Sequence, residues 1–465
     1  MLEKTKAIQD KIVITTLESL MPREHFLRDL NNVVDFSFIY EKVEHLYSKF
    51  GRPAVDPVQL IKMILLGFLY GINSERKIER EIQVNIAYRW FLGLDLDSRV
   101  PDHSTISQTR RRKFNDSNIF EEIFIEVVKQ CIEKGLVDGT TILTDSTHVK
   151  ANASMKSKES VTISVEPSEY MKRLDEICNA EGSRDSDSKR GRKSNTEPKT
   201  RIIQKSKTDP DSGMLNRPEK PKGFHYLAHQ SVDVKCGIIT DVHVTPANVD
   251  DHIPYVQRIK HQKEKLNLQI KEVGIDKAYD HVEIHKEMYD MGIKTYVPLV
   301  DRKTDSKSFP TKIFEYNLTN NTYTCPNNQQ LAYTHINKNK RHKIYSASQK
   351  ICKNCQLKSK CITATTKFRT LSIPLHQHEA TLQRANYRTT RYYAVQRLRK
   401  IYCEGNFALQ KDNHNLRNTR KRGNKNVTEH CLMSALALNL KRMVKHILFY
   451  SIFLFISQNK RHPLS

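Results

Sequence analysis

The chain has 465 residues, which is enough for two or three domains. Its 77 Lys and Arg residues outnumber its 52 Asp and Glu residues and give a formal net charge of +25. Such an excess attracts polyanions, of which nucleic acid is the commonest and an anionic membrane surface the competitor, and it argues against basic partners.

The first residues, MLEKTKAIQDK, include no apolar run of the kind a signal peptide has. Nine cysteines in a chain that is not secreted argue against a disulfide scaffold. We therefore expect a cytoplasmic protein whose clustered cysteines either bind metal or have no ligand.

Residues 1–134 are expected to form a helical domain. Asp56 is a suitable N-cap, Pro57 fits the first helical position, and apolar residues follow at helical spacing to Leu69. A second helix is predicted over 75–84, and a third follows a cap at 102–104 and carries a basic cluster. Short helices that end in a basic element indicate a helix-turn-helix-like domain for DNA binding, and the alternative is a dimerisation module with a solvated basic face. The cluster is Arg110, Arg111, Arg112 and Lys113.

Residues 135–300 are expected to form the first part of an α/β catalytic core. A β-branched run over 141–143 predicts a buried strand with Asp145 at its carboxyl end. Residues 155–222 are rich in Ser, Lys, Arg, Asp and Glu, so they predict a flexible insertion. Two strands (224–234 and 237–244), a helix (253–266), a strand ending at Asp276 (270–275), a helix (281–289) and a strand (294–299) follow. This order predicts an RNase H-like mixed sheet flanked by helices.

Residues 301–380 are expected to form a small cysteine-bearing insertion, with a zinc ribbon as one alternative. A Cys-x2-Cys pair with two further cysteines has the ligand number of a structural Zn²⁺ site, although the spacing departs from that of a regular ribbon. Zinc binding and reduced thiols without a ligand are equally consistent with this pattern. The four residues are Cys325, Cys352, Cys355 and Cys361.

Residues 381–445 are expected to complete the core with a basic helix that carries Glu404. From 382 to 425 there are twelve Lys or Arg residues and two acids, Glu404 and Asp412, which indicates a surface that faces phosphate. In the tail, 446–465, the apolar run 447–456 is far shorter than the roughly 20 residues of a spanning helix. We expect it to pack on the core as a helix or strand, with a membrane anchor as the alternative.

Asp145, Asp276 and Glu404 stand on three separate elements and can meet only in the folded chain. Together they would suit Mg²⁺ or Mn²⁺, which prefer oxygen ligands. Each has an ordinary alternative, because Asp145 can bond to the amides that follow it, Asp276 can cap a helix or pair with Lys277, and Glu404 can pair with Lys400. Rival acids in the same region are Asp233, Asp241, Asp250 and Asp251.

Four motifs spread over most of the chain resemble those of the DDE transposases of bacterial insertion sequences: PDHSTISQTRRR, TDSTHVKANAS, GIDKAYD and CEGNFALQKDNHNLRNTRKRG. The resemblance implies an RNase H-like catalytic domain with Asp145, Asp276 and Glu404 as its metal-binding triad. It also implies magnesium-dependent nicking at terminal inverted repeats and strand transfer into target DNA. Family members often have Tyr and Arg seven and four residues before the glutamate and Lys seven after it. Lys411 matches, whereas Arg397 and Lys400 replace the first two.

The resemblance therefore predicts an active transposase that binds double-stranded DNA at terminal repeats and at the target, as a homodimer in the DNA complex, near the nucleoid and without a membrane. An inactive inverted-repeat-binding repressor or remnant is the alternative. A stand-alone nuclease would share the chemistry but would not need an end-recognition domain.

Overall fold

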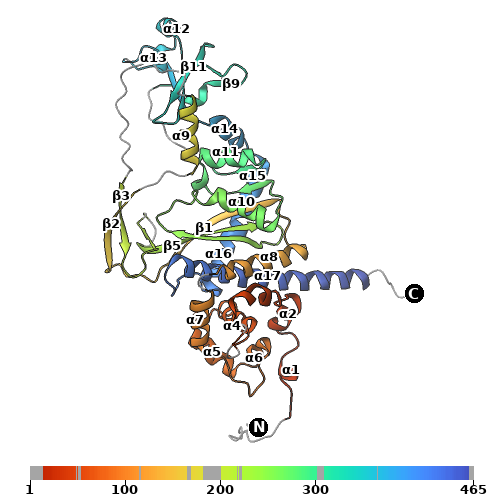
Figure 1. Ribbon diagram of the computed structural model, residues 1–465. Coiled ribbons are helices and arrows are strands. Elements are labelled where there is room, and N and C mark those ends of the chain that lie inside the picture. The colour runs from red at the N-terminus through yellow and green to blue at the C-terminus, as the bar shows by residue number, and fades with distance from the viewer. Residues whose placement is uncertain are drawn as a thin grey trace, which may run out of the picture.

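The computed structural model describes residues 14–48, 50, 54–114, 117–164, 169–181, 200–216, 218, 222–300, 308–363 and 365–459, and for 450–459 only the backbone. Figure 1 shows N-terminal helices at the bottom, a central sheet with its helices in the middle and a second sheet at the top. The middle and bottom parts share one hydrophobic core, whereas the upper sheet has a small core of its own.

The N-terminal part is helical, as predicted. Asp56 caps the helix that begins at Pro57, accepting hydrogen bonds from the Val58 and Gln59 amides at 2.7 and 3.2 Å. Asp102 caps the helix that precedes the basic cluster, and the cluster itself forms a π-helical turn over Arg110–Phe114. The α-helices are α1 (Leu17–Leu20), α2 (Phe26–Val33), α3 (Phe38–Val43), α4 (Pro57–Leu69), α5 (Glu75–Val84), α6 (Ile86–Leu92), α7 (His103–Thr109) and α8 (Ile119–Glu133).

The central sheet consists of β1 (Thr141–Lys150), β4 (Gly213–Leu215), β5 (Gly223–Asp233), β6 (Ile239–Pro246), β7 (Glu272–Gly274) and β8 (Lys294–Tyr296). β5 pairs antiparallel with β1 on one edge and with β4 and β6 on the other. β7 is parallel to β1, and β8 is parallel to β7. Helices α10 (Tyr255–Leu266) and α11 (Val282–Asp290) follow β6 and β7. The order β6-β5-β1-β7-β8 confirms the predicted RNase H-like sheet.

The last helix, α17 (Asn424–Asn459), runs between the sheet and the N-terminal helices (Figure 1). It contacts β6 and α8 on one side and α2 and α4 on the other. Leu432, Met433, Ala435 and Leu436 are all buried, as in a helix that is surrounded by protein. The predicted C-terminal tail thus continues a core helix. Ile447 packs against the core, whereas Leu448 and Phe449 are exposed, so the expected packing of the apolar run is wrong for those two residues. Among the helices described, none combines the length and the apolar character needed to cross a membrane.

The stretch 155–222, expected to be flexible, contains regular structure where it is described. β2 (Lys158–Ser164) and β3 (Thr200–Ser206) form a two-stranded antiparallel sheet, and α9 (Glu169–Glu181) lies between them in the sequence. α9 is ordered because Tyr170, Leu174 and Cys178 pack against Leu375 of the upper part of the molecule. Composition alone does not reveal such a partner. Residues 182–199, the most polar part of the stretch, lie outside the described residues.

The cysteine-bearing insertion is an antiparallel sheet in the order β13-β12-β11-β10-β9. Its strands are β9 (Glu315–Asn317), β10 (Thr322–Thr324), β11 (Gln330–Asn337), β12 (His342–Ser346) and β13 (Thr370–Pro374), with α12 (Gln349–Lys353) and α13 (Lys358–Cys361) between the last two. The chain then returns to the central sheet through α14 (Gln377–Arg384), α15 (Thr390–Arg399) and α16 (Gly405–Asn413).

Candidate active site

Strand register brings the first two predicted acids together. The pairing of β1 with β7 ends at Leu143 and Gly274, and Asp145 and Asp276 each lie two residues beyond that pair. β1 is longer than predicted, because β5 continues to pair with it as far as Lys150. Asp145 therefore lies within a strand, not at its end, but at the point where the parallel neighbour stops. The edge of β1 is open there, on the side where Asp276 follows β7.

Helix α15 lies across this point. A Cβ atom added to Gly274 would meet Val395 Cγ1 at 2.5 Å and Leu143 Cδ2 at 2.8 Å, so Val395 packs directly onto the end of β7. Arg399 follows Val395 by one helical turn, and Asp145 follows Leu143 by two residues on the same face of the strand. The Nη1 atom of Arg399 accordingly donates to Asp145 Oδ2 at 2.7 Å.

The third acid reaches the same place through an irregular helix. The turn Lys400–Glu404 is π-helical, so it holds one more residue than an α-helical turn. In a regular α-helix, the residue four positions before Glu404 would lie one turn away from it. Because of the extra residue, that place is taken by Arg399, which is five positions before Glu404. Sequence comparison assigned that position to Lys400, which is exposed. The basic residue at the site is Arg399, and the sequence carries no clear sign of the inserted residue.

Arg399 is the centre on which the three acids converge. Its Nη2 atom lies 3.8 Å from Asp276 Oδ1 and 3.8 Å from Glu404 Oε1, in addition to the bond to Asp145. The Asp145 side chain is 17% exposed, against 46% for Asp276 and 57% for Glu404. Burial raises the pKa of Asp145 to about 6; Arg399 and the Ser146 amide oppose this rise, and the charges of Asp276 and Glu404 add to it. One acid is therefore held within the fold, and two face solvent.

The ordinary alternatives for these acids are partly realised. Asp145 accepts a hydrogen bond from the Ser146 amide at 2.8 Å, as a local cap would. Asp276 precedes a 3-10 turn without a side-chain capping bond, and the ion pair recorded for Glu404 is with Arg399.

The rival acids are mostly committed elsewhere. Asp233 accepts from the Gly139 and Lys235 amides, and Asp241 is held by Arg258. Asp250 is exposed. Asp251 is the one beside the site, because it accepts from Ser146 Oγ at 2.6 Å.

Two family models match the chain. The transposase domain (DUF772) covers residues 15–112, and the transposase DDE domain covers residues 324–444 and thus includes Glu404. The chain thus carries two transposase domains, the second of them of the DDE type. Asp145 and Asp276 lie outside both matched segments, so their assignment depends on the geometry above.

Solved structures similar to this chain include a piggyBac transposase synaptic complex with hairpin DNA, at 9% identity and a TM-score of 0.32, covering 91% of this chain and 73% of the other. A Mos1 transposase paired-end complex with the left transposon end has 7% identity and a TM-score of 0.17, with coverages of 54% and 61%. No curated protein matches the chain.

The predicted DNA-binding cluster of the N-terminal domain divides in two. Arg110 is only 14% exposed and forms ion pairs with Glu75 and Glu429, which join α5, the π-helical turn and α17. The Lys113 ammonium lies 3.4 Å from the centre of the Tyr47 ring. Arg111 and Arg112 are exposed. The first two side chains therefore stabilise the domain, and the latter two remain available to a ligand.

The three basic residues predicted near Glu404 also differ from one another. Arg397 and Lys400 are exposed. The Lys411 ammonium donates to Thr147 Oγ1 at 2.6 Å. Thr147 follows Asp145 by two residues, so Lys411 lies along the face of β1 that carries the acid.

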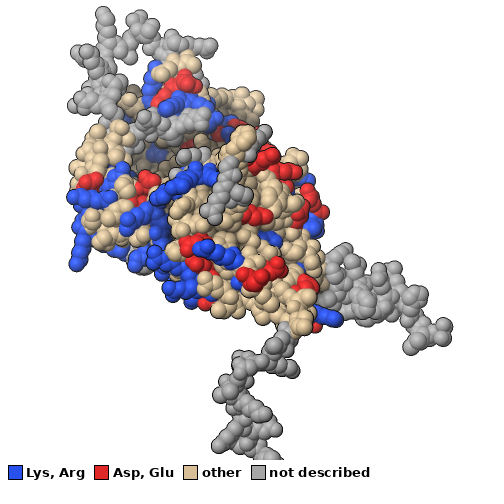
Figure 2. All heavy atoms as spheres, turned by 60° about the horizontal axis from the view of Figure 1, so that its bottom comes forward, with Lys and Arg blue, Asp and Glu red and all other residues tan. Residues whose placement is uncertain are grey.

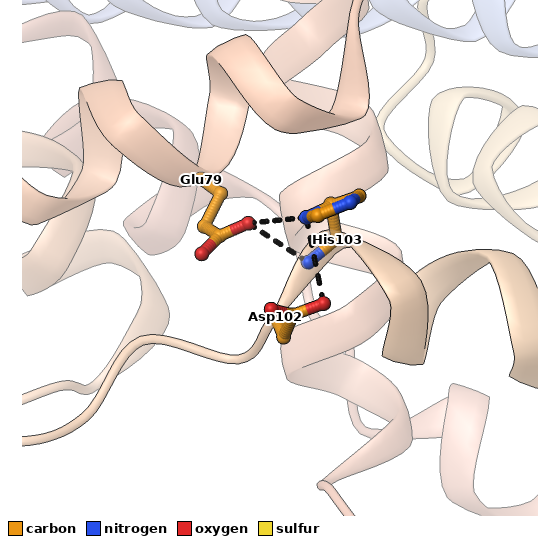
Figure 3. Close-up of side chains that lie close together, drawn as sticks. All are labelled: Glu79, Asp102 and His103. Carbon is orange, nitrogen blue, oxygen red and sulfur yellow. Dashed lines mark hydrogen bonds and ion pairs between the residues drawn. The ribbon is translucent and has the colours of Figure 1, made fainter.

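A separate group has the spacing of metal ligands. Among the described residues, Glu79, Asp102 and His103 form the group whose ligand atoms all lie within 4.8 Å of one another (Figure 3). His103 Nδ1 lies 2.7 Å from Glu79 Oε2, and Arg76 donates to His103 Nε2 at 3.1 Å. With Nε2 accepting, Nδ1 carries the proton, and Asp102 caps α7 through the Ser104 amide. These contacts join α5 to α7 and leave neither ring nitrogen available to a cation.

The acids around Arg399 have the chemistry of divalent-cation ligands, but their oxygens do not all lie within 4.8 Å of one another, since among the described residues only the Glu79 group does. The donor set consists of carboxylate oxygens, which Mg²⁺ and Mn²⁺ prefer. Two of the three carboxylates face solvent and can turn toward a bound ion. Burial, and to a smaller extent the charges of Asp276 and Glu404, raises the pKa of Asp145, and Arg399 opposes this rise as a bound cation would.

Proposed function

We propose that this transposase binds the terminal inverted repeats of an insertion sequence, cuts the DNA there and transfers the cut strand to target DNA. The observation that supports this most is the meeting of Asp145, Asp276 and Glu404 at Arg399, from β1, from the end of β7 and from the helix after α15. In-line phosphoryl transfer needs such a set of acids to hold metal beside a DNA phosphate.

Each side chain has a distinct part in this proposal. Asp145 is the fixed ligand, because the Ser146 amide and Arg399 hold its two oxygens at 2.8 and 2.7 Å. Asp276 and Glu404 are the ligands on the solvent side, where DNA arrives. Divalent ions bound to these acids would activate a water or 3′ hydroxyl and stabilise the leaving oxygen. Lys411, held by Thr147, would contact a phosphate next to the one that reacts.

A basic edge leads away from these acids. The Lys150 amide donates to the Arg417 carbonyl at 3.2 Å, and Arg422 Nε donates to the Asn152 carbonyl at 3.2 Å, so the segment after α16 lies against the end of β1. The exposed bases there are Lys150, Arg417, Arg420 and Arg422. Lys150 is five residues from Asp145, or about 17 Å along an extended strand. If these bases neutralise phosphates of a bound DNA, phosphates farther along the same DNA would lie at the three acids.

The charges over the wider surface agree with a DNA path on one side. In the view of Figure 2, Lys and Arg gather on the left flank, whereas Asp and Glu lie mainly over the middle and right. Exposed Arg111 and Arg112 of the N-terminal domain would add contacts to the terminal repeat. Synapsis of two transposon ends would bring two copies of the chain together as a homodimer.

The test is cleavage of a labelled duplex that carries the element's own terminal repeat, with Mg²⁺ or Mn²⁺. Wild type is compared with Asp145→Asn, Asp276→Asn and Glu404→Gln, and the control is Asp412→Asn. Asp412 is an exposed acid on the same helical segment as Glu404, and it pairs with Arg417 at the surface. We expect the three substitutions to abolish nicking without loss of repeat binding, and the control to nick as wild type does.

Two other results would change the assignment. Repeat binding without cleavage by wild type would favour the inactive repressor or remnant. Continued cleavage by one of the three variants would remove that acid from the site, and Asp251, which bonds to Ser146, would then be tested first.

A further inference from the structure

The nine cysteines fall into two groups by environment. Cys131, Cys178, Cys403 and Cys431 are buried, and Cys236 is half-buried in the turn after β5. The remaining four belong to the insertion and are all partly exposed: Cys325, Cys352, Cys355 and Cys361. These four are 36 residues apart at most in the sequence, and the fold brings them closer.

Contacts place the four cysteines at one end of the insertion sheet. Cys325 follows β10 and begins a tight turn in which its amide donates to the Gln329 carbonyl at 2.8 Å and its carbonyl accepts from the Asn328 amide at 2.9 Å. Within this turn, Asn327 Nδ2 lies 3.6 Å from Cys355 Sγ. The turn after β10 therefore touches the link between α12 and α13.

The other two cysteines face the same place. Cys325, Cys352 and Cys361 all pack against the small core of the insertion sheet. The Cys355 amide donates to the Cys352 carbonyl at 3.5 Å, and the Lys358 amide donates to the Cys355 carbonyl at 3.1 Å. A short turn therefore links Cys352 and Cys355 to α13, which ends at Cys361.

The insertion also needs stabilisation beyond its own packing. The core between its strands consists of the buried residues Phe314, Tyr323, Leu331, Tyr345, Ala347, Leu371 and Ile373. A unit this small buries too little apolar surface to fold firmly, and natural domains of this size commonly use metals or disulfides. The cysteine segment shows the need most clearly, because α12 and α13 have five and four residues, too few to persist alone in water.

We infer that Cys325, Cys352, Cys355 and Cys361 bind one Zn²⁺ as a structural site that ties the segment α12–α13 to the turn after β10. Four thiolates from two chain segments are the ligand set of a closed structural zinc site. The sulfur atoms are more widely spaced than zinc ligands, since among the described residues only the Glu79 group lies within 4.8 Å. Metal binding would therefore require the thiols to rotate about their Cα–Cβ bonds.

The four cysteines belong to a different sheet from the proposed catalytic acids, but the insertion is joined to the rest of the protein by packing and by the chain itself. Ile336 of β11 and Leu375, which follows β13, pack against α9, and Arg341 forms an ion pair with Asp175 of α9 at 2.7 Å. From Leu375 the chain enters α14 and then α15, which carries Arg399. A zinc site would therefore act as a structural support of the insertion, with no part in phosphoryl transfer.

The experiment measures zinc in the purified full-length chain by plasma mass spectrometry, after exhaustive dialysis. We expect one zinc per chain in wild type, and loss of at least tenfold in Cys352→Ser and in Cys355→Ser. The matched control is Cys236→Ser, which removes an equally half-buried cysteine outside the insertion and should keep full zinc content.

A second measurement does not depend on the folding of any variant. Wild type is freed of zinc with a chelator and titrated with Co²⁺, which gives an intense thiolate charge-transfer band and tetrahedral d–d bands when bound by four cysteines. We expect saturation at one Co²⁺ per chain and displacement by one Zn²⁺. Wild type without stoichiometric zinc, a cobalt spectrum without the thiolate band, or full zinc content in both insertion variants would overturn the inference.

Discussion

Gly274 ends β7 beneath α15, at a point where a side chain has no space. A Cβ atom there would lie 2.5 Å from Val395 Cγ1 and 2.8 Å from Leu143 Cδ2, and both of those residues are fully buried. Carbon atoms rarely approach within 3.0 Å, so Gly274→Ala would force Val395 away by at least 0.5 Å, the difference between 3.0 and 2.5 Å. Overpacking of this kind costs about 1–3 kcal/mol in free energy of unfolding.

The displacement would act on the site as well as on stability. Arg399 lies one turn beyond Val395, and Glu404 follows in the next turn, so a shift of α15 would move both relative to Asp145. We therefore expect Gly274→Ala to lower the free energy of unfolding by about 2 kcal/mol. Repeat cleavage should fall more steeply than the folded fraction does. The assays are urea denaturation and cleavage of the repeat duplex.

A double-mutant cycle separates packing from other causes. Val395→Ala removes the methyl group that lies nearest the new Cβ, so it should cost less in the Gly274→Ala background than in wild type, with a coupling energy of about 1 kcal/mol. Strict additivity of the two substitutions, or a Gly274→Ala variant as stable as wild type, would refute this account of how α15 is positioned.

Three further predictions follow from charge and burial. Arg399→Gln should cost ~3 kcal/mol in stability by leaving Asp145 unpaired, and Mn²⁺ should raise its Tm more than it raises that of wild type, an effect that melting curves with and without metal would detect. Burial lowers the pKa of His430 to about 4, whereas an unfolded histidine titrates near 6.5. Because His430 takes up a proton between these values only in the unfolded chain, this residue should contribute a loss of about 3 kcal/mol in stability as pH decreases from 6.5 to 4. His430→Gln should flatten that pH profile, and an unchanged slope would contradict the assignment. Arg110→Ala should destabilise the protein with little change in the salt dependence of DNA binding, whereas Arg112→Ala should reduce that dependence at constant stability; the reverse pattern would contradict the division of the basic cluster.

Much of the fold could be predicted from sequence because local signals agreed with the final structure. Asp56 and Pro57 marked the start of α4, and the strand and helix order from 224 to 299 matched the sheet and its helices. The length of β1 could not be predicted, since all of residues 146–150 except Val149 are polar and the segment is strand because β5 pairs with it. α9 was missed for a similar reason, as its apolar face depends on a segment about 200 residues later in the chain.

The three acids of the candidate site could be predicted from the sequence, whereas the arginine between them, Arg399, could not. Asp145 and Asp276 stand out because each follows an apolar run, and register then aligns them. Arg399 was missed because the π-helical turn shifts the spacing to Glu404 by one residue, and a helical residue count cannot detect such a turn. Arg110 was assigned to DNA because charge patterns do not show that Glu75 and Glu429 will pair with it in the folded protein.

Helix α17 has a consequence for how the protein is made. It supplies the surface on which both the N-terminal helices and β6 pack, and the Asn439 side chain forms two hydrogen bonds of 2.8 Å with the Ile239 backbone, completing that edge strand. Ile239 lies 200 residues before Asn439 in the chain, and α2 and α4 lie farther still from α17. During synthesis, the apolar faces of the early helices and of the sheet therefore stay exposed until the ribosome has released α17 as far as about residue 444. Chaperone demand, and loss of truncated chains to proteolysis, are the expected cost of closing the core last.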